Sequence, residues 1–262
     1  MTKQGAALVT GAGKRIGRAI ALHLASQGLD VAFHYASSRD EAEEAASEAL
    51  ALGVKAIAVG ADLLDPAETD QLVPAAAKGL GQPLSVLVNN ASIFEYDNMS
   101  TATAESWRRH MVSNLRAPFF LSQAFVAQAP AAGTDEFGEA VANAMIVNMV
   151  DMRVRKLTPE FMTYTIAKSA LWTFTQTAAQ AMAPSVRVNA IGPGPTMKGH
   201  RQSEDHFRTQ RSRTVLERGS NPEDIVSAVD FLLRNKAVTG QLICVDGGQH
   251  LAWKTPDVLG VE

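Results

Sequence analysis

Short apolar and β-branched runs alternate along this chain with longer stretches of helical character. The runs occupy residues 6–10, 30–35, 55–59, 85–89, 144–149, 186–191 and 242–245. Neighbouring parallel strands are joined by crossover helices, and strands covered on both faces are apolar throughout rather than alternating. The pattern therefore predicts an α/β fold with a seven-stranded parallel sheet and helices on both faces.

Length and composition are typical of a single soluble enzyme domain. The chain has 262 residues, of which 46% are hydrophobic and 19% charged, with a net charge of −3. We expect one domain over residues 1–262, and no binding to nucleic acid or membrane. A single cysteine, Cys244, allows no intrachain disulfide. We therefore expect the protein in a reducing cytoplasm.

A glycine-rich segment, TGAGKRIG at residues 10–17, lies between the first apolar run and a helical stretch. Glycines let a backbone turn tightly and approach a pyrophosphate, which the N-terminus of the following helix attracts. This predicts a doubly wound, Rossmann-like dinucleotide fold. The last two glycines are separated by three residues instead of two, and an ordinary tight turn remains the alternative. The expected cofactor contacts are Gly11, Gly13, Arg15, Ile16 and Gly17.

The end of the second predicted strand indicates which dinucleotide would bind. NAD sites usually place an Asp or Glu there to bond the ribose hydroxyls, whereas this chain reads HYASSR at residues 34–39. Donors and positive charge suit a 2′-phosphate, so we expect NADPH and NADP⁺, with contacts from His34, Tyr35 and Ser37. The alternative is that Arg39 merely faces solvent at the start of a helix.

Tyr164 and Lys168 are spaced one helical turn apart, so both side chains lie on one helix face. A phenol normally titrates near pH 10, and an adjacent ammonium favours the phenolate and lowers the pKa toward a useful range. Such a pair also arises by chance in many chains. Its position after a glycine-rich loop and five predicted strands favours catalysis.

The chain resembles the short-chain dehydrogenase/reductase family over essentially its whole length. The resemblance rests on residues 10–17, ADL at 61–63, NNAS at 89–92, Asn114, Tyr164 with Lys168, Pro193 with Gly194, and VDGG at 245–248, in the family's order. It implies that Tyr164 is the general acid, that Lys168 holds the nicotinamide ribose, and that Asn114 anchors a proton-relay water. A helix kink is expected just after Asn114, because Pro118 interrupts the helical pattern.

The same resemblance implies most of the remaining cofactor contacts. Asp62 and Leu63 would flank the adenine, and residues 89–92 would pass beside the ribose and nicotinamide. The expected contacts are Asp62, Leu63, Asn89, Ala91, Ser92, Tyr164, Lys168, Pro193, Gly194 and Thr196.

Asp151 departs from the general family pattern, in which most members carry a serine about thirteen residues before the tyrosine. A carboxylate at this position would repel a developing alkoxide, whereas a protonated carboxyl could donate to a ring nitrogen. The alternative is a strand-end Asp that caps a local turn. We therefore expect Asp151, Tyr164, Lys168 and Asn114 as the catalytic set.

Four features together are similar to the pteridine reductases and dihydromonapterin reductases. They are Asp151, the Lys14-Arg15 pair, the His34-Tyr35 pair and the SIF segment at residues 92–94. This likeness implies a pterin held between nicotinamide and Phe94, with substrate contacts from Arg15, Ser92, Phe94, Asp151 and Tyr164. Phe94 could equally be a hydrophobic wall residue, and Ser37 stands where members of this branch can carry an arginine.

The sequence thus favours an NADPH-dependent pterin reductase and leaves two alternatives open. One is a reductase of ketones or sugars, and the other is a catalytically silent NADP(H)-binding regulator. Residues 196–216 interrupt the strand–helix rhythm and are expected to cover the substrate. We find no metal-ligand spacing around His200 or His206. The apolar stretch 117–127 and the family resemblance lead us to expect a homotetramer.

Overall fold

All seven predicted strands form one parallel sheet in the computed structural model, which describes residues 5–199 and 202–255. The spatial order is β3-β2-β1-β4-β7-β8-β9. The strands are β1 (Ala6–Val9), β2 (Asp30–Tyr35), β3 (Ala56–Gly60), β4 (Val86–Asn89), β7 (Ala144–Met149), β8 (Val186–Pro193) and β9 (Leu242–Val245). The predicted fold class is confirmed, with strand ends within two residues of those expected.

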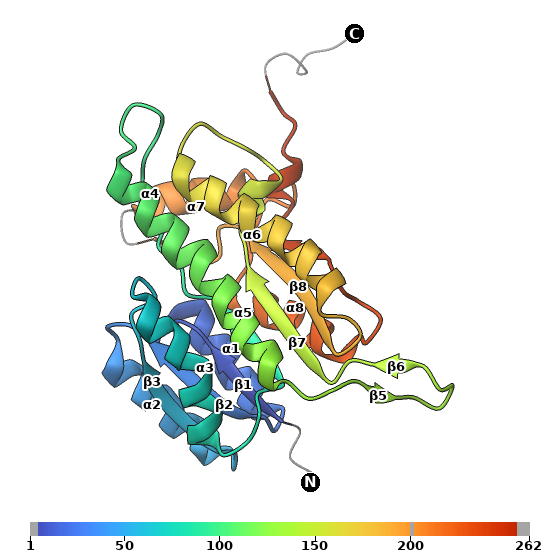
Figure 1. Cartoon of the computed structure of the whole chain (residues 1–262). Coiled ribbons are helices and arrows are strands. Elements are labelled where there is room, and N and C mark those ends of the chain that lie inside the picture. Colours follow the sequence, from blue (N-terminus) through green and yellow to red (C-terminus); the bar gives the residue numbers. More distant parts are fainter. Residues whose placement is uncertain (1–4, 200–201, 256–262) are drawn as a thin grey trace.

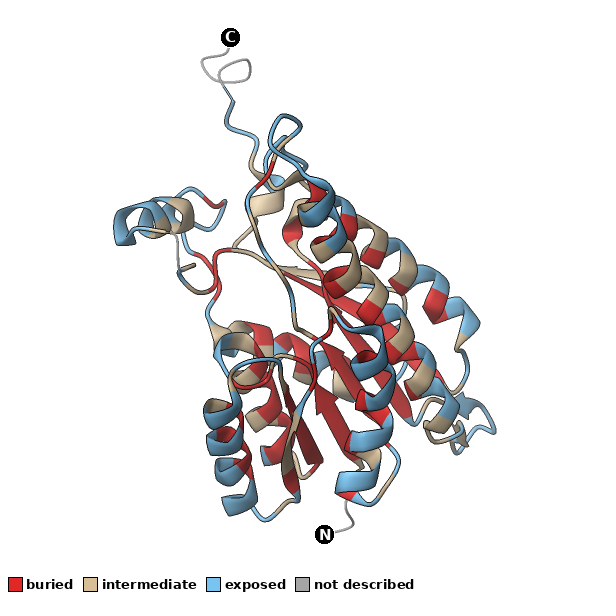
Figure 2. Ribbon diagram, turned by 60° about the vertical axis from the view of Figure 1, so that its left-hand side comes forward, coloured by how far each residue is buried: buried red, intermediate tan, exposed pale blue. Residues whose placement is uncertain are grey.

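Helices cover both faces of the sheet and bury two separate hydrophobic cores (Figure 1). One face carries α1 (Arg15–Ser26), α2 (Arg39–Ala51) and α8 (Pro222–Arg234). The other carries α3 (Pro66–Leu80), α5 (Ala117–Gln128) and α6 (Met162–Ala181), with α4 (Ala104–Met111) packed on α6. Figure 2 shows buried residues concentrated on the sheet and on the helix sides that face it.

A π-helical segment, η1 (Val112–Arg116), joins α4 to α5 and contains Asn114. Pro118 lies in the first turn of α5, where its missing N–H leaves a backbone carbonyl in the preceding turn without the usual partner. The expected irregularity is therefore present, as a π-bulge rather than a break.

Two features of the fold were not expected from the sequence. A two-stranded hairpin, β5 (Gly133–Thr134) with β6 (Ala140–Val141), projects beyond the sheet (Figure 1). Short helical turns follow β7, as η2 (Met152–Val154), and β9, as η3 (Gln249–Leu251). Two-residue strands carry too little pattern to be recognised in a sequence.

The candidate site residues gather at the carboxyl ends of the parallel strands. The strand order reverses between β1 and β4, so the loops that follow these two neighbouring strands lead to helices on opposite faces of the sheet. Doubly wound folds bind their ligands at this point. The segment after β8 contains a short helix, α7 (Glu204–Ser212), and residues 200 and 201 of the expected covering segment lie outside the described residues. No described helix is long and apolar enough to cross a membrane.

Candidate active site

The glycine-rich loop between β1 and α1 needs its glycines for steric reasons. Gly11 has a φ of +64°, which favours glycine. A Cβ on Gly17 would lie 2.2 Å from the carbonyl oxygen of Gly11, and one on Gly13 would lie 2.7 Å from the Ser38 hydroxyl. The loop is therefore drawn tightly against the start of α1, with its backbone open to a ligand.

Asn90 fixes this loop to the end of β4, a role that the sequence did not reveal. Its backbone N–H donates to the Thr10 hydroxyl at 2.9 Å, and its amide donates to the Thr10 carbonyl at 2.8 Å. Asn89 points the other way and donates to Asn148 on β7 at 2.8 Å, within the buried sheet. The two side chains face opposite sides because they are successive residues at a strand end, and the cofactor contact expected of Asn89 stays a prediction.

Both ring nitrogens of His34 bond within the protein. Nδ1 accepts from the Gly11 N–H at 3.0 Å, and Nε2 lies 3.0 Å from the Ala61 carbonyl oxygen, to which it donates. The imidazole therefore joins the glycine-rich loop to the end of β3 instead of offering a nitrogen to the cofactor. Burial lowers the pKa of His34 from 6.5 to about 4.

This buried imidazole predicts a loss of stability in mild acid. Between pH 6.5 and about 4, the unfolded chain binds a proton that the folded chain excludes, so the folded state weakens as pH falls through this interval. The loss should approach about 3 kcal/mol of unfolding free energy. Urea unfolding at pH 7 and pH 4.5 measures it. A His34→Gln variant should lose less stability than wild type over this interval, and an equal loss in both would contradict the assignment.

The ribose end of the cleft holds no carboxylate at the end of β2. Ser37 is exposed there, and Tyr35 is half-buried. Arg39 is exposed and donates to Glu43 at 2.9 Å. This agrees with the alternative that Arg39 faces solvent at the start of a helix. At the next strand end, Leu63 is buried, while the Asp62 carboxylate accepts from the Leu64 N–H at 2.9 Å.

Arg15 connects the glycine-rich loop with the segment that follows β8. Its guanidinium donates to the Lys198 carbonyl at 2.9 Å and to the Met197 carbonyl at 3.1 Å. Thr196, just before these residues, is buried and shares a 2.6 Å hydrogen bond with the Ser220 hydroxyl. The predicted covering segment is therefore tied to the start of α1 and to the loop before α8.

Asp151, Tyr164 and Lys168 meet between β7 and α6. The Tyr164 hydroxyl donates to the Asp151 carboxylate at 3.0 Å, and the Arg153 N–H donates to its other oxygen at 2.8 Å. The Lys168 ammonium donates to the Met149 carbonyl at 2.7 Å and lies 5.8 Å from the centre of the Tyr164 ring. Asp151 thus caps a local turn, as its alternative describes, and also contacts the tyrosine.

Burial dominates the protonation of these three groups. It raises the pKa of Asp151 and lowers that of Lys168 to about 8. The pKa of Tyr164 is raised well above its ordinary value by burial and by the Asp151 carboxylate. The expected lowering of the tyrosine pKa by Lys168 is therefore absent, because the nearest charged group to the phenol is the carboxylate rather than the ammonium. Tyr164 therefore keeps its proton, and burial favours the protonated form of Asp151.

Asn114 uses its side chain to fix the loop that follows β4. Its carboxamide oxygen accepts from the Ile93 N–H at 2.9 Å, and its amide donates to the Ile93 carbonyl at 2.8 Å. The Ser92 hydroxyl lies 3.3 Å from the same oxygen. The π-bulge thus orients residues 92 and 93 beside Tyr164. The role expected of Asn114 in anchoring a relay water stays a prediction.

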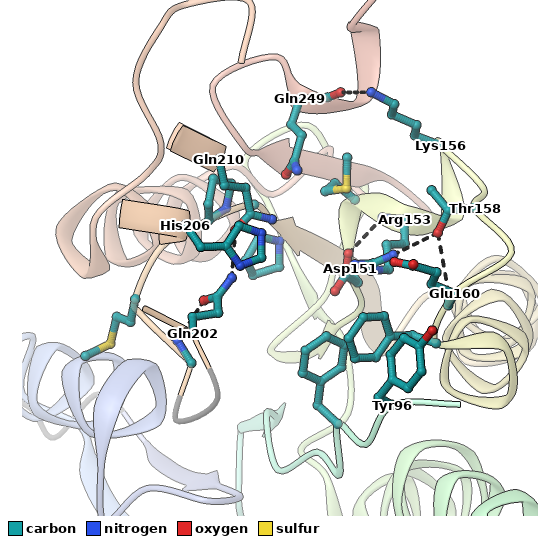
Figure 3. Close-up of a pocket in the computed structure, with 18 of the residues that line it drawn as sticks. Tyr96, Asp151, Arg153, Lys156, Thr158, Glu160, Gln202, His206, Gln210 and Gln249 are labelled. Carbon is teal, nitrogen blue, oxygen red and sulfur yellow. Dashed lines mark hydrogen bonds between the residues drawn. The ribbon is translucent and has the colours of Figure 1, made fainter. Parts of the chain in front are cut away.

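A pocket of about 790 Å³ opens beside this trio. Phe94 stacks on Phe161, with ring centres 4.4 Å apart and planes 7° apart. It also meets Tyr164 edge to face, with ring centres 4.7 Å apart. Figure 3 shows Gln202, His206 and Gln210 facing Asp151 and Tyr96 across the pocket. Pro193 and Gly194 also line it. The pocket is therefore flanked by an aromatic wall on one side and the α7 segment on the other.

Among the described residues, no group of three or more His, Cys, Asp or Glu side chains is placed to hold a metal ion.

Comparison with known proteins identifies the family. The profile of a family described as enoyl-(acyl carrier protein) reductase matches residues 11–250. A short-chain type dehydrogenase/reductase from Picea abies is 31% identical, with 93% of this chain and 91% of that protein covered. The chain belongs to the short-chain dehydrogenase/reductase family.

Relatives within this family include proteins with different substrates. The 3-oxoacyl-[acyl-carrier-protein] reductase FabG of Staphylococcus epidermidis is 31% identical, with 94% of this chain and 98% of FabG covered. FolM alternative dihydrofolate reductase 1 from Brucella suis, solved with NADP, has a TM-score of 0.90 and 40% identity, covering 98% of this chain and 100% of FolM. The angucycline C-6 ketoreductase LanV, also solved with NADP, has a TM-score of 0.84 and 32% identity, covering 94% and 96%.

Proposed function

We propose that this short-chain dehydrogenase/reductase is an NADPH-dependent reductase of a pterin, with Asp151 and Tyr164 as its proton donors. The observation that carries the proposal is the half-buried Asp151 carboxyl, 3.0 Å from the Tyr164 hydroxyl, in the place where most members have a serine. Its raised pKa favours a neutral acid, and a neutral acid can donate to a ring nitrogen. The FolM neighbour, named as a dihydrofolate reductase, supports the same substrate class.

The residues of the cleft fit NADP(H). The glycine-rich loop packs closely against the start of α1, and the N–H groups of a helix N-terminus attract a pyrophosphate. The end of β2 offers the Ser37 hydroxyl and no carboxylate, which suits a 2′-phosphate. Lys168, Pro193 and Gly194 lie where the nicotinamide half of an extended dinucleotide would reach. Bound NADPH supplies the hydride.

Protons move from the two buried acids to the substrate. Hydride addition to the carbon of a C=N bond leaves negative charge on nitrogen, and a donor within hydrogen-bond reach neutralises it. Asp151 or Tyr164 donates that proton, and the hydrogen bond between them lets one reprotonate the other. Phe94 offers an aromatic face against which a flat pterin ring can stack, and it is 49% exposed. Ser92, beside Tyr164, and Arg15 complete the proposed substrate contacts.

Two further parts of the proposal concern the covering segment and assembly. Residues 196–216 would close over the substrate, with the Arg15 contacts to Met197 and Lys198 holding the segment near the cofactor. On α5, Phe119 and Val126 are exposed in the single chain. Their burial between subunits would account for the apolar character of α5, and we propose a homotetramer in the cytoplasm.

The second candidate function is reduction of a ketone or related carbonyl. It is favoured by the sequence likeness to FabG and the structural likeness to LanV. Asp151 weighs against it, because it stands in place of the serine that bonds the substrate oxygen in most family members.

Oxidation of NADPH with dihydropterins, dihydrofolate and a panel of ketones tests the proposal. We expect turnover of at least one reduced pterin at a kcat/KM at least about tenfold above that of any ketone. Turnover of ketones alone would overturn the pterin assignment. Tight NADPH binding with no turnover of any substrate would favour a silent regulator.

A Ser37→Asp variant should weaken the preference for NADPH. A carboxylate at the end of β2 repels a 2′-phosphate and accepts from ribose hydroxyls. We expect kcat/KM for NADPH to fall by about tenfold or more and that for NADH to rise, each measured with the best substrate of the panel. Ser47→Asp adds the same charge at an exposed position further along α2 and should change neither value. An unchanged cofactor ratio in Ser37→Asp would place the 2′-phosphate elsewhere.

A further inference from the structure

A buried chain of hydrogen bonds lies directly behind Tyr164 and has no part in the proposed proton transfer. The Glu95 N–H donates to His110 Nε2 at 3.2 Å, so the proton of the neutral ring is on Nδ1. His110 Nδ1 lies 2.7 Å from the Thr163 hydroxyl, which it therefore reaches as a donor. The Thr163 hydroxyl in turn donates to the Asp97 carboxylate. Every bond in the chain has a defined direction.

Asp97 also supplies the missing cap of α6. Phe161, the residue before the helix, has a φ of 54° and makes no side-chain cap. The Thr163 N–H instead donates to the Asp97 carboxylate at 3.1 Å, and the Met162 N–H donates to the Asp97 carbonyl at 3.3 Å. A carboxylate at a helix N-terminus is also favoured by the helix dipole. The loop after β4 thus holds the first turn of α6, which contains Tyr164.

The hydrogen-bonded residues also contact Tyr164 directly, through the ring of His110. The rings of His110 and Tyr164 meet edge to face with centres 5.9 Å apart, and His110 is fully buried. On its other side Tyr164 meets Phe94. The phenol is therefore held between a substrate-wall residue and a histidine whose own orientation is fixed by two hydrogen bonds.

We propose that His110, Thr163 and Asp97 form a positioning network that holds the Tyr164 hydroxyl against Asp151. Phe94 and Asp151 line the pocket, whereas these three residues do not. They act on the reaction by positioning Tyr164. The proposal rests on the catalytic role of Tyr164 proposed above and does not depend on which substrate is reduced.

The charges around His110 favour the arrangement described. Burial lowers the pKa of His110. The nearby carboxylates of Asp97 and Glu95 raise it, and the cations of Arg109 and Lys168 lower it further. The net shift is downward, so the ring stays neutral. Burial alone would raise the pKa of Asp97, but hydrogen bonds from Thr163 and Ser106 outweigh it and keep that carboxyl ionised. A neutral donor ring and an ionised acceptor give the chain its single direction.

Substitutions of Thr163 test the network with a matched pair. Thr163→Val keeps the branched shape and removes the hydroxyl, whereas Thr163→Ser keeps the hydroxyl. We expect Thr163→Val to lower kcat about tenfold or more, since small misplacements of a reacting group cost up to about a hundredfold. Thr163→Ser should stay within about threefold of wild type in kcat, and the NADPH Kd should change less than about threefold in both.

A second readout needs no substrate. The chain has three tyrosines, so NMR of ring-labelled tyrosine, assigned with Tyr164→Phe, follows the Tyr164 phenol directly. Because the Asp151 contact raises the pKa of Tyr164, loosening it should lower that pKa in Thr163→Val and leave it unchanged in Thr163→Ser. This result stands or falls whether or not a pterin is the substrate.

Two outcomes would overturn the network: a wild-type kcat in Thr163→Val, or a Tyr164 pKa that is the same in both variants and wild type. If Thr163→Val does not fold, His110→Phe keeps a ring beside Tyr164 and removes both hydrogen bonds of the histidine. It should lower the Tyr164 pKa in the same direction, and an unchanged pKa there would equally contradict the proposal.

Discussion

Replacing Asp151 with serine should lower kcat for dihydropterin reduction by about a hundredfold or more. Asp151 is the group whose raised pKa supplies an acid beside the substrate, and it accepts the Tyr164 hydrogen bond at 3.0 Å. Serine retains a hydroxyl but is a far weaker acid, so protonation of a ring nitrogen slows. Steady-state NADPH oxidation measures the loss, with the NADPH Kd as a check that the cofactor site is intact.

The same variant discriminates between the two candidate substrate classes. Serine is the residue that most family members carry here, so reduction of ketones should be preserved or raised in Asp151→Ser. An Asp151→Asn variant provides the control, since it removes the acid without creating the family's usual hydroxyl and should be poor with both classes. Undiminished dihydropterin reduction by Asp151→Ser would contradict the role assigned to this carboxyl.

Replacing Tyr164 with phenylalanine should lower kcat by about 10²- to 10⁴-fold for every substrate that the enzyme reduces. The substitution keeps the ring contacts with Phe94 and His110 and removes only the hydroxyl. NADPH binding should be nearly unchanged, because most of the proposed cofactor contacts lie outside Tyr164, in the glycine-rich loop and at Lys168. The measurement is kcat together with the NADPH Kd.

A matched control is Tyr96→Phe, which removes a hydroxyl from another pocket aromatic that packs on Phe161. We expect this variant to lose less than about tenfold in kcat, since among the described residues its hydroxyl bonds only to Asn98, at 3.3 Å. Equal activity in Tyr164→Phe and wild type would mean that another group delivers the proton.

The sheet could be predicted because each strand carries its own signal. Strands such as β7 and β8 are apolar over their whole length since both faces are covered, and their limits follow from the sequence itself. The glycine-rich loop could also be recognised from the sequence, because its three glycines lie between a predicted strand and a predicted helix. Each glycine permits a close contact, either within the loop or with the end of a neighbouring strand.

The side-chain roles that were predicted differently depend on partners far along the chain. His34 lies at the predicted position, yet its ring bonds to Gly11 and Ala61, which no pattern near residue 34 indicates. Likewise the network of Asp97, His110 and Thr163 joins residues up to 66 positions apart. Local periodicity and spacing carry no information about such pairings.

The protonation of Tyr164 shows the same limit in energetic terms. Spacing places Lys168 on the same helix face but does not show that Asp151 is nearer to the hydroxyl, or that burial outweighs the ammonium. Spacing alone therefore predicts a lowered Tyr164 pKa, which is the wrong direction.

A crystal structure with NADP⁺ and a reduced pterin bound tests the central claim most directly. The account predicts a pterin stacked on Phe94, with an Asp151 carboxyl oxygen within about 3 Å of a ring nitrogen. A pterin bound away from Phe94, or one whose ring nitrogens all face groups other than Asp151 and Tyr164, would contradict it.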